Sequence, residues 1–437
     1  MNNRKTPLHF ISVSILICFI SSAFAQKTVT VDDRAGVLGE TGAPVIIKAA
    51  GNYSQVSTLI ETSADGLKNE IPVQLRKNAK GSEWILMMPA GKPGIRKFKP
   101  TRKTAPAAPV MTAEENAADG QVIIRESGKR VLQYNYRTVY EPDVVRAEGK
   151  RNVPMAYSKV EGAYYDEYLK AHPKLTKDAA ATSSIYAVPR SDYIHPIYGL
   201  NGEMLTCDWP DGGHPHHRGI FWAWPEVEYK SERGDIYALL RVFARPTGNI
   251  SYTNGAVFAE IEAENIWMWE NEKPIVREQV TITAYRASQN SRVIDLTVTF
   301  QAIEDEVTVA TRFTNSYGGL NVRMETPAKQ QISYYTDPAD ASPLRAWANF
   351  NGKFENNQSE SGMTILQHPS NPEYPGAWVQ YPNLSWVQPT FPTPGTRYPL
   401  SKDKTLTLKY RFVIHQGNTP DNDISAKRWD AFQSTNF

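Results

Sequence analysis

Five long runs of alternating apolar and polar residues constrain the fold of this chain more than any other feature of its sequence. They cover residues 257–265, 275–285, 293–300, 307–313 and 406–414. Side chains two positions apart lie on the same face of a strand, so each run predicts a strand with one buried face. No amphipathic helix is predicted between the runs. This pattern argues against a parallel α/β fold and predicts a large antiparallel sandwich or barrel.

The N-terminal part of the chain predicts a second, smaller β structure. Short strand-like runs occupy residues 44–47, 57–60, 71–75 and 84–88. Gly, Asn and Lys separate these runs, which is typical of a small β-sandwich-like module, and we assign it to residues 26–99. Residues 100–120 are rich in Pro, Ala and Thr and poor in bulky apolar side chains. They predict a linker.

The large domain is expected to span residues 121–437 and to begin with a β-hairpin. Its two arms are 121–125 and 130–136, joined by a turn that contains Ser127 and Gly128. Residues 141–184 are charged and rich in Tyr, and we interpret them as an inserted loop that carries a short helix. The overall prediction is an all-β protein.

Residues 1–25 have the three parts of a Sec signal peptide. A short basic region precedes an apolar run at 10–20, and Ala23-Phe24-Ala25 forms a cleavage site before Gln26. We therefore expect a periplasmic or secreted protein. No later stretch approaches the roughly 20 apolar residues that cross a bilayer, so no membrane span is predicted. Removal of the leader leaves Cys207 as the single cysteine, which excludes an internal disulfide.

The charge balance argues against a nucleic-acid partner. The chain has 48 Lys and Arg against 46 Asp and Glu, and the leader carries two of the basic residues and no acid. The remaining chain is therefore neutral and has no large basic surface. The sequence does not determine the oligomeric state.

The densest group of polar residues lies between Cys207 and Gly219 and includes His214, His216 and His217. These are three of the seven histidines that follow the leader. Imidazole exchanges protons near neutral pH, so the cluster predicts general acid–base catalysis, with His216 and His217 as the proton-transfer groups. The alternative is that individual imidazoles only satisfy the backbone of the loop.

Three charged residues flank these histidines. Arg218 is predicted to stabilise developing negative charge, and either Asp208 or Asp211 is predicted to orient an imidazole. Together with His216 and His217 they form the predicted catalytic set.

A metal site is the competing interpretation of the same segment. In an extended strand His214 and His216 would lie on one side with their Cα atoms about 6.6 Å apart, as in an HxH metal site. The third ligand would be His195, His368 or Asp208. The acid–base interpretation is preferred because the Cys/His pairing of structural zinc sites is missing. No cofactor is predicted, and a divalent metal is the open alternative.

Other residues are predicted to bind substrate around the cluster. Nine of the ten tryptophans follow residue 200, and most are expected in the core. Trp222 and Trp224 leave the histidine loop on one strand face and are predicted to stack on a sugar ring. The remaining predicted substrate-binding residues are His195, Arg323 and His368.

Several short motifs occur along the chain in a characteristic order. They are Tyr193-Ile-His-Pro, Gly202-Glu, His214-Pro-His-His-Arg-Gly219 followed by Trp222 and Trp224, Gly318-Gly-Leu-x-Val-Arg323, His368-Pro-Ser-Asn-Pro372 and Tyr410-Arg-x-x-x-His-x-Gly417. In this order, from residue 121 to the C-terminus, they resemble the DUF6807 family, often labelled "PmoA family protein". The methane mono-oxygenase subunit that this label suggests needs membrane-spanning helices, and the sequence predicts none.

The resemblance implies an exported protein of polysaccharide-degrading bacteria. It also implies a large antiparallel supersandwich similar to galactose mutarotase, in which histidines and a carboxylate on the concave sheet face transfer protons on a sugar. The resulting hypothesis is a carbohydrate-active protein that performs histidine-based glycoside cleavage, elimination or epimerisation. The alternatives are a non-catalytic glycan-binding protein and a metal-dependent enzyme.

Overall fold

A computed structural model describes most of the chain. The described residues are 28–33, 38–49, 56–62, 68–78, 81–89, 91, 93–101, 109–139, 144–147, 189–210, 214, 216–335, 345–420 and 422–433. The expected leader and most of the expected insertion at 141–184 lie outside them. The contacts divide the chain into two compact units: Ala107–Ser425 forms one, and Met1–Pro106 with Ala426–Phe437 forms the other.

The smaller unit contains two antiparallel sheets. In spatial order they are β1 (Val29–Asp33), β7 (Gly94–Thr101), β3 (Thr58–Thr62) and β4 (Lys68–Pro72), and then β2 (Pro44–Lys48), β6 (Gly81–Met87) and β5 (Gln74–Asn78). Leu59, Trp84 and Phe98 are among the residues of its hydrophobic core. The run predicted at 71–75 is divided at Val73 into β4 and β5, which belong to different sheets.

Two helices accompany these sheets. They are α1 (Leu38–Thr41) and α3 (Asn422–Gln433), and the latter belongs to this unit from Ala426 onward. Arg428 in α3 donates from Nε to the carbonyl oxygen of Thr41. The C-terminus therefore differs from the predicted division, which placed all residues after 120 in the large domain.

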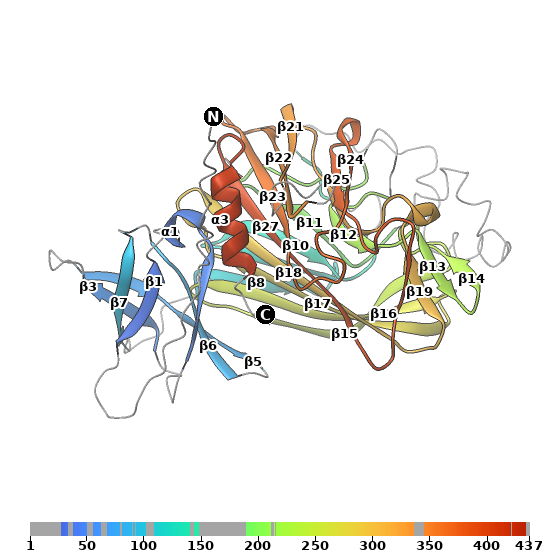
Figure 1. Ribbon diagram of the computed structural model, residues 1–437, viewed down its shortest axis with the longest axis horizontal. Helices are drawn as coiled ribbons and strands as arrows, with labels where there is room; N and C mark the ends of the chain where they lie inside the picture. The colour runs from blue at the N-terminus through green and yellow to red at the C-terminus, as the bar shows by residue number, and fades with distance from the viewer. Residues whose placement is uncertain are drawn as a thin grey trace, which may run out of the picture. The chain divides into compact units, whose positions relative to one another are not determined.

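The larger unit contains two eight-stranded antiparallel sheets and one of four strands (Figure 1). The first sheet contains, in order, β24 (Trp378–Tyr381), β25 (Trp386–Pro389), β20 (Gly319–Arg323), β12 (Ile220–Ala223), β11 (Tyr193–Ile197), β10 (Lys129–Asn135), β9 (Gln121–Glu126) and β8 (Met111–Asn116). The second contains β15 (Val242–Thr253), β16 (Phe258–Trp269), β17 (Lys273–Tyr285), β18 (Ser291–Ala302), β27 (Leu406–Gln416), β23 (Ser361–Gln367), β22 (Trp347–Lys353) and β21 (Ala328–Tyr335). The third contains β14 (Glu232–Gly234), β13 (Glu226–Tyr229), β19 (Val307–Ala310) and β26 (Arg397–Pro399).

One hydrophobic core joins the two large sheets into a sandwich. Ile220 and Val322 of the first sheet belong to the same buried cluster as Ile282, Leu296 and Phe412 of the second. In β16 and β17 buried apolar side chains alternate with more exposed ones over much of each strand, as the sequence pattern predicts. The prediction of an all-β fold with a large antiparallel supersandwich is therefore confirmed.

Two elements differ in extent from the sequence-based prediction. Strand β8 lies within the segment 100–120 that was expected to be a linker, and it pairs with β9 in full register. The run at 307–313 ends as β19 at Ala310, and the short helix η4 (Arg312–Thr314) follows. Phe313 adopts a positive φ of 50° there, which a regular strand cannot accommodate.

Candidate active site

The histidine loop is held by backbone hydrogen bonds to the segment that precedes it. Gly219 donates to the carbonyl of Cys207 at 2.8 Å, and Trp209 donates to that of His217 at 3.2 Å. Gly219 has a φ of +56°, and a Cβ atom there would lie 2.4 Å from the carbonyl oxygen of Ile194. Only glycine fits both conditions, so this residue fixes the loop against strand β11.

The loop brings three imidazoles together, and we call His214, His216 and His217 the imidazole cluster. Their ring centroids lie 4.6 Å apart for His216 and His217, 5.2 Å for His214 and His217, and 5.7 Å for His214 and His216. His214 is exposed, whereas the other two rings are buried. The structure therefore joins these three predicted residues in one place. Asp211 lies outside the described residues.

The imidazole cluster is electrically neutral at neutral pH. Burial lowers the pKa of His216 and His217 well below the ordinary value of 6.5, and the neighbouring imidazoles and Arg323 lower it further. Partial burial of its ring lowers the pKa of His214 as well, and the charges of Arg323 and Arg312 contribute. Each ring is thus present as the base, which is the form that accepts a proton.

Four aromatic residues surround the imidazole cluster, and we call Tyr237, Tyr317, Trp386 and Tyr381 the aromatic wall. The indole ring of Trp386 stacks on the His217 ring, with centroids 5.6 Å apart and planes inclined by 16°, and on the Tyr381 ring at 5.0 Å and 21°. Tyr237 packs against His216 at 5.4 Å and against Tyr317 at 5.2 Å. Tyr381 is 40% exposed, so the wall extends from the buried imidazoles to the surface.

Arg190 holds the tyrosine of the aromatic wall that contacts His216. Its guanidinium is buried and donates to the carbonyl oxygens of Ile236 and Tyr237 at 3.0 and 3.1 Å. It also lies over the Phe221 ring at 4.5 Å. These bonds hold the backbone of Tyr237, and with it the Tyr237 ring that packs against His216. Arg190 is therefore a positioning residue for the site.

Arg323 is the other predicted residue that joins the site. Its partner in the β20–β25 ladder is Trp386, and Val322 beside it faces the core, so the Arg323 side chain leaves the opposite face of the sheet. It is buried, and its charge lowers the pKa of all three cluster histidines. Arg323 therefore lies close to the imidazole cluster.

Arg218 and Asp208 do not have the roles predicted for them. Arg218 is fully buried, and its Nε donates to Oδ1 of Asp208. The Tyr193 hydroxyl donates to the other carboxylate oxygen at 2.8 Å and accepts from Arg218 Nη2 at 2.8 Å. The guanidinium carbon also lies 4.7 Å from the ring centroids of Tyr193 and Trp209. These two charges neutralise each other, so Asp208 does not orient an imidazole and Arg218 is not available to a substrate.

His195 is a satisfied core histidine. Its Nε2 donates to the carbonyl oxygen of Val145 at 2.7 Å, because a carbonyl only accepts. Its Nδ1 accepts from the Thr206 hydroxyl at 3.0 Å, and that hydroxyl accepts from the backbone of Ile197. Both ring nitrogens are used, so the structure does not support His195 as a metal ligand or as a substrate-binding residue.

His368 lies in the turn that follows β23, a strand of the second large sheet. Its Nδ1 accepts from the backbone N–H of Ser370 at 3.1 Å and lies 2.7 Å from the Ser370 hydroxyl. Its own backbone N–H donates to Lys409. This is the role of a turn histidine, and no described contact joins it to the imidazole cluster.

Trp222 and Trp224 lie in the core and not in a sugar cleft. The Trp222 indole donates to Oε1 of Glu278 at 2.9 Å across the sandwich, and the Trp224 indole donates to the carbonyl of Phe391 at 2.6 Å. Both are almost fully buried. The prediction of a shared strand face was right, but that face is the inner one.

Among the described residues no group of three His, Cys, Asp or Glu side chains has the arrangement of a metal site. The set of His214, His216 and His195 that the sequence suggested is not formed, since His195 is engaged elsewhere.

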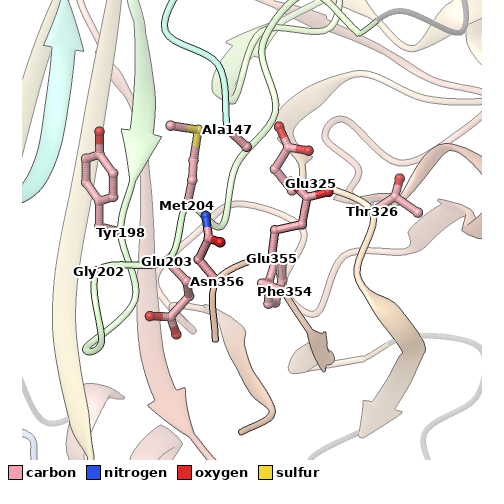
Figure 2. Close-up of a pocket in the computed structure, with 10 residues that line it drawn as sticks. All are labelled: Ala147, Tyr198, Gly202, Glu203, Met204, Glu325, Thr326, Phe354, Glu355 and Asn356. Atoms are coloured by element: carbon pink, nitrogen blue, oxygen red, sulfur yellow. The ribbon is translucent and has the colours of Figure 1, made fainter. Parts of the chain in front are cut away.

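A pocket of about 190 Å³ is lined by Glu325 and Thr326, which closely follow Arg323 in the sequence. Figure 2 shows Glu325 and Thr326 on one side of it and Tyr198, Glu203 and Met204 on the other. Glu203 is engaged by Asn357, whose amide donates to it at 3.0 Å. Glu325 follows Arg323 by two residues, and the Cys207 thiol interacts with both side chains. The pocket thus adjoins the site through Cys207.

The sequence-based reasoning missed the aromatic wall and Arg190. Trp386 was counted among the tryptophans, but nothing in its local sequence separates it from core residues. Tyr237 and Tyr317 stand in segments without any catalytic motif. Only the pairing of β20 with β25 places Trp386 beside Arg323.

A comparison with family models identifies a match over most of the larger unit. The model described as "Family of unknown function (DUF6807)" covers residues 176–430. This protein belongs to the DUF6807 family. The matched range includes the imidazole cluster, Arg323 and the whole aromatic wall. The site is therefore contained in the DUF6807 region of the chain.

The other comparisons add little to the family assignment. Among solved structures, a chain titled "Putative kojibiose phosphorylase from human microbiome" is similar at 10% identity with a TM-score of 0.26. The similarity covers 50% of the DUF6807 protein and 26% of that chain. No curated protein matches the DUF6807 protein. None of the described helices is both long and apolar enough to cross a membrane.

Proposed function

We propose that this protein is an exported carbohydrate-active enzyme in which His216 and His217 transfer protons on a sugar. The observation that carries the proposal is the packing of neutral imidazoles against an aromatic wall that reaches the surface. The imidazoles supply the base, and the rings supply apolar faces of the kind that stack on a sugar. The reaction class is glycoside cleavage, elimination or epimerisation.

The neutral charge state of the imidazole cluster favours a role as a general base over a role as a general acid. Because burial keeps His216 and His217 deprotonated, either can accept a proton from a sugar hydroxyl or carbon. The Nδ1 atom of His217 is buried and has no hydrogen-bond partner among the described residues. A ligand donor placed there would satisfy a group that is otherwise costly to bury.

Tyr381 supports the sugar-binding part of the proposal. It lies at the end of the edge strand β24, where its ring stacks on Trp386 and remains partly exposed. An exposed aromatic ring next to buried polar groups is the arrangement expected at the mouth of a binding site. Tyr381 therefore replaces Trp222 and Trp224 as the proposed sugar platform.

A panel of neutral and acidic polysaccharides tests the function. The purified protein is incubated with each glycan, and the products are identified by mass spectrometry. New reducing ends, unsaturated products or epimers from at least one glycan support the enzyme. Recovery of a bound but unchanged glycan would instead identify a binding protein, and no binding to any glycan would overturn both interpretations.

The Tyr381→Ala variant is expected to bind its glycan roughly two- to twelvefold more weakly, since an aromatic contact contributes about 0.5–1.5 kcal/mol. The matched control is Tyr252→Ala, because Tyr252 is 43% exposed on the edge strand β15 of the other large sheet. Isothermal titration calorimetry measures both. Equal loss in the two variants would contradict a platform at Tyr381.

Export is part of the proposal and has its own test. When the full chain is produced in a Gram-negative host, the periplasmic protein is expected to begin at Gln26. N-terminal sequencing of that fraction reads the cleavage site directly. An intact Met1 on the recovered protein would remove the export assignment and leave the site unaffected.

A further inference from the structure

Arg323 differs from the other buried arginines in what surrounds its charge. The described residues include seven buried arginines. Arg218 and Arg411 form ion pairs with aspartates, and Arg190 donates to backbone carbonyls. Arg323 is 6% exposed, and its Nε and Nη1 atoms have no hydrogen-bond partner among the described residues. Its described polar contact is with the Cys207 thiol.

An arginine in this state is costly for the unliganded protein. Burying a charge without a partner removes its hydration and returns no ion-pair energy. No carboxylate oxygen of the described residues lies within 4.0 Å of the guanidinium, and Glu325, which acts on it through space, is directed toward the neighbouring pocket. A structural role would have provided the guanidinium with acceptors, as Arg218 and Arg411 show.

Other unused donors lie beside Arg323. The Trp386 indole N–H has no hydrogen-bond partner among the described residues, and Trp386 is paired directly with Arg323 in the ladder. The buried Tyr237 hydroxyl also has none, and the charge of Arg323 acts on it. Three side chains therefore present donors in one region with few acceptors. A ligand rich in acceptor oxygens and negatively charged would satisfy all of them.

Two carboxyl groups act on these donors through space, Glu325 on Arg323 and Asp235 on Tyr237, and burial raises the pKa of Asp235 to about 7. The imidazole cluster is neutral, and Arg190 and Arg312 add two positive charges to that of Arg323. Arg312 donates to the Tyr317 hydroxyl at 2.7 Å. Three arginines stand against two carboxyl groups, one of which is only partly ionised at neutral pH, so the region keeps a net positive charge, which favours an anion over a neutral sugar.

We propose that Arg323 binds the anionic substituent of an acidic sugar, a carboxylate or a sulfate group, beside the imidazole cluster. This inference rests on the proposed carbohydrate function and names the class of glycan. It assigns Arg323 to substrate binding, with the Trp386 and Tyr237 donors as its neighbours in the same site.

Three sets of oligosaccharides distinguish the sources of the negative charge. They contain uronic acids, the same oligosaccharides after reduction of their carboxyl groups, and sulfated galactans. The wild-type protein is expected to bind one of the two acidic sets. Its affinity for that set should be at least tenfold higher than its affinity for the neutral, carboxyl-reduced oligosaccharides. Arg323→Gln is expected to lose at least tenfold in affinity for the acidic set, and Arg323→Lys less. The control Arg277→Gln changes an exposed arginine on β17 and should bind as the wild type does.

A second readout does not depend on the glycan. At equal ionic strength, 10 mM sodium sulfate is expected to raise the melting temperature of the wild-type protein more than that of Arg323→Gln. Without any anion, Arg323→Met should melt at a higher temperature than the wild type, because a desolvated charge is removed. A lower melting temperature would show a structural role and overturn the proposal.

The two proposals fail in different ways. If neutral glycans bind well and Arg323→Gln does not change their affinity, the anion site is wrong and the carbohydrate function stands. If no glycan binds but sulfate stabilises only proteins that retain Arg323, the anion site stands and the carbohydrate function is wrong. If neither response is seen, both are wrong.

Discussion

The Arg218→Met variant is expected to lose about 3–5 kcal/mol of its free energy of unfolding, which is enough to abolish folding in a marginally stable domain. The substitution leaves the buried carboxylate of Asp208 with the Tyr193 hydroxyl as its described partner. It also removes the cation–π contacts of Arg218 with Tyr193 and Trp209. Urea denaturation followed by tryptophan fluorescence measures the change.

A double substitution separates the ion pair from the packing around it. In Arg218→Met with Asp208→Leu, no buried charge remains, and most of the lost stability should return. Arg411→Met provides a comparison, because Arg411 forms the same kind of buried pair with Asp295 in the second sheet. A loss below about 1 kcal/mol for Arg218→Met would show that the pair is not a structural element of the loop.

The His217→Ala variant is expected to lose roughly 10²- to 10⁴-fold in turnover on the glycan that the panel identifies, which is the usual contribution of a proton-transfer residue. His216→Ala should show a loss in the same range if both imidazoles act. The loop itself is held by backbone bonds and by Arg218, so both variants should keep their fold. Initial rates and melting temperatures are measured together, with Tyr252→Ala as the control. Full activity in both histidine variants would contradict the mechanism.

The pH dependence provides an independent check of the same prediction. The base must be neutral, and burial lowers the pKa of His216 and His217 well below 6.5. On acidification kcat/KM should therefore stay constant down to pH 6.5 and fall only at lower pH, when the imidazole becomes protonated. If His217 is the base, the residual kcat/KM of the His217→Gln variant should not show this fall at low pH, the acid limb of the profile. An acid limb centred above pH 6.5 would contradict a buried imidazole base.

Much of the fold could be predicted because strand periodicity is a local property. The runs at 257–265, 275–285 and 406–414 became β16, β17 and β27 with small changes at their ends. In one of the predicted runs a local conformation ended the strand early. The run after Val307 ends early because the chain turns at Phe313.

The candidate site could be predicted only in part. The concentration of His214, His216 and His217 within four residues keeps their backbones close, but neighbouring side chains on a strand would point to opposite faces. The turn in which His217 donates to the carbonyl of His214 at 2.9 Å brings the three rings together. The opposite error occurred at Trp222 and Trp224. Alternation correctly gave them one strand face, but sequence alone does not say whether that face meets the second sheet or the substrate.

Sequence alone therefore determined the class of fold, the family and the position of the imidazole cluster, since each depends on residues close together in the chain. The tertiary structure decided which charges are available. Arg218 lies beside the histidines in sequence yet is neutralised by Asp208, whereas Arg323 comes from a strand more than a hundred residues later and has no carboxylate partner among the described residues. Strand pairing and burial make that distinction, because they determine which polar atoms meet a partner inside the protein and which remain for a ligand.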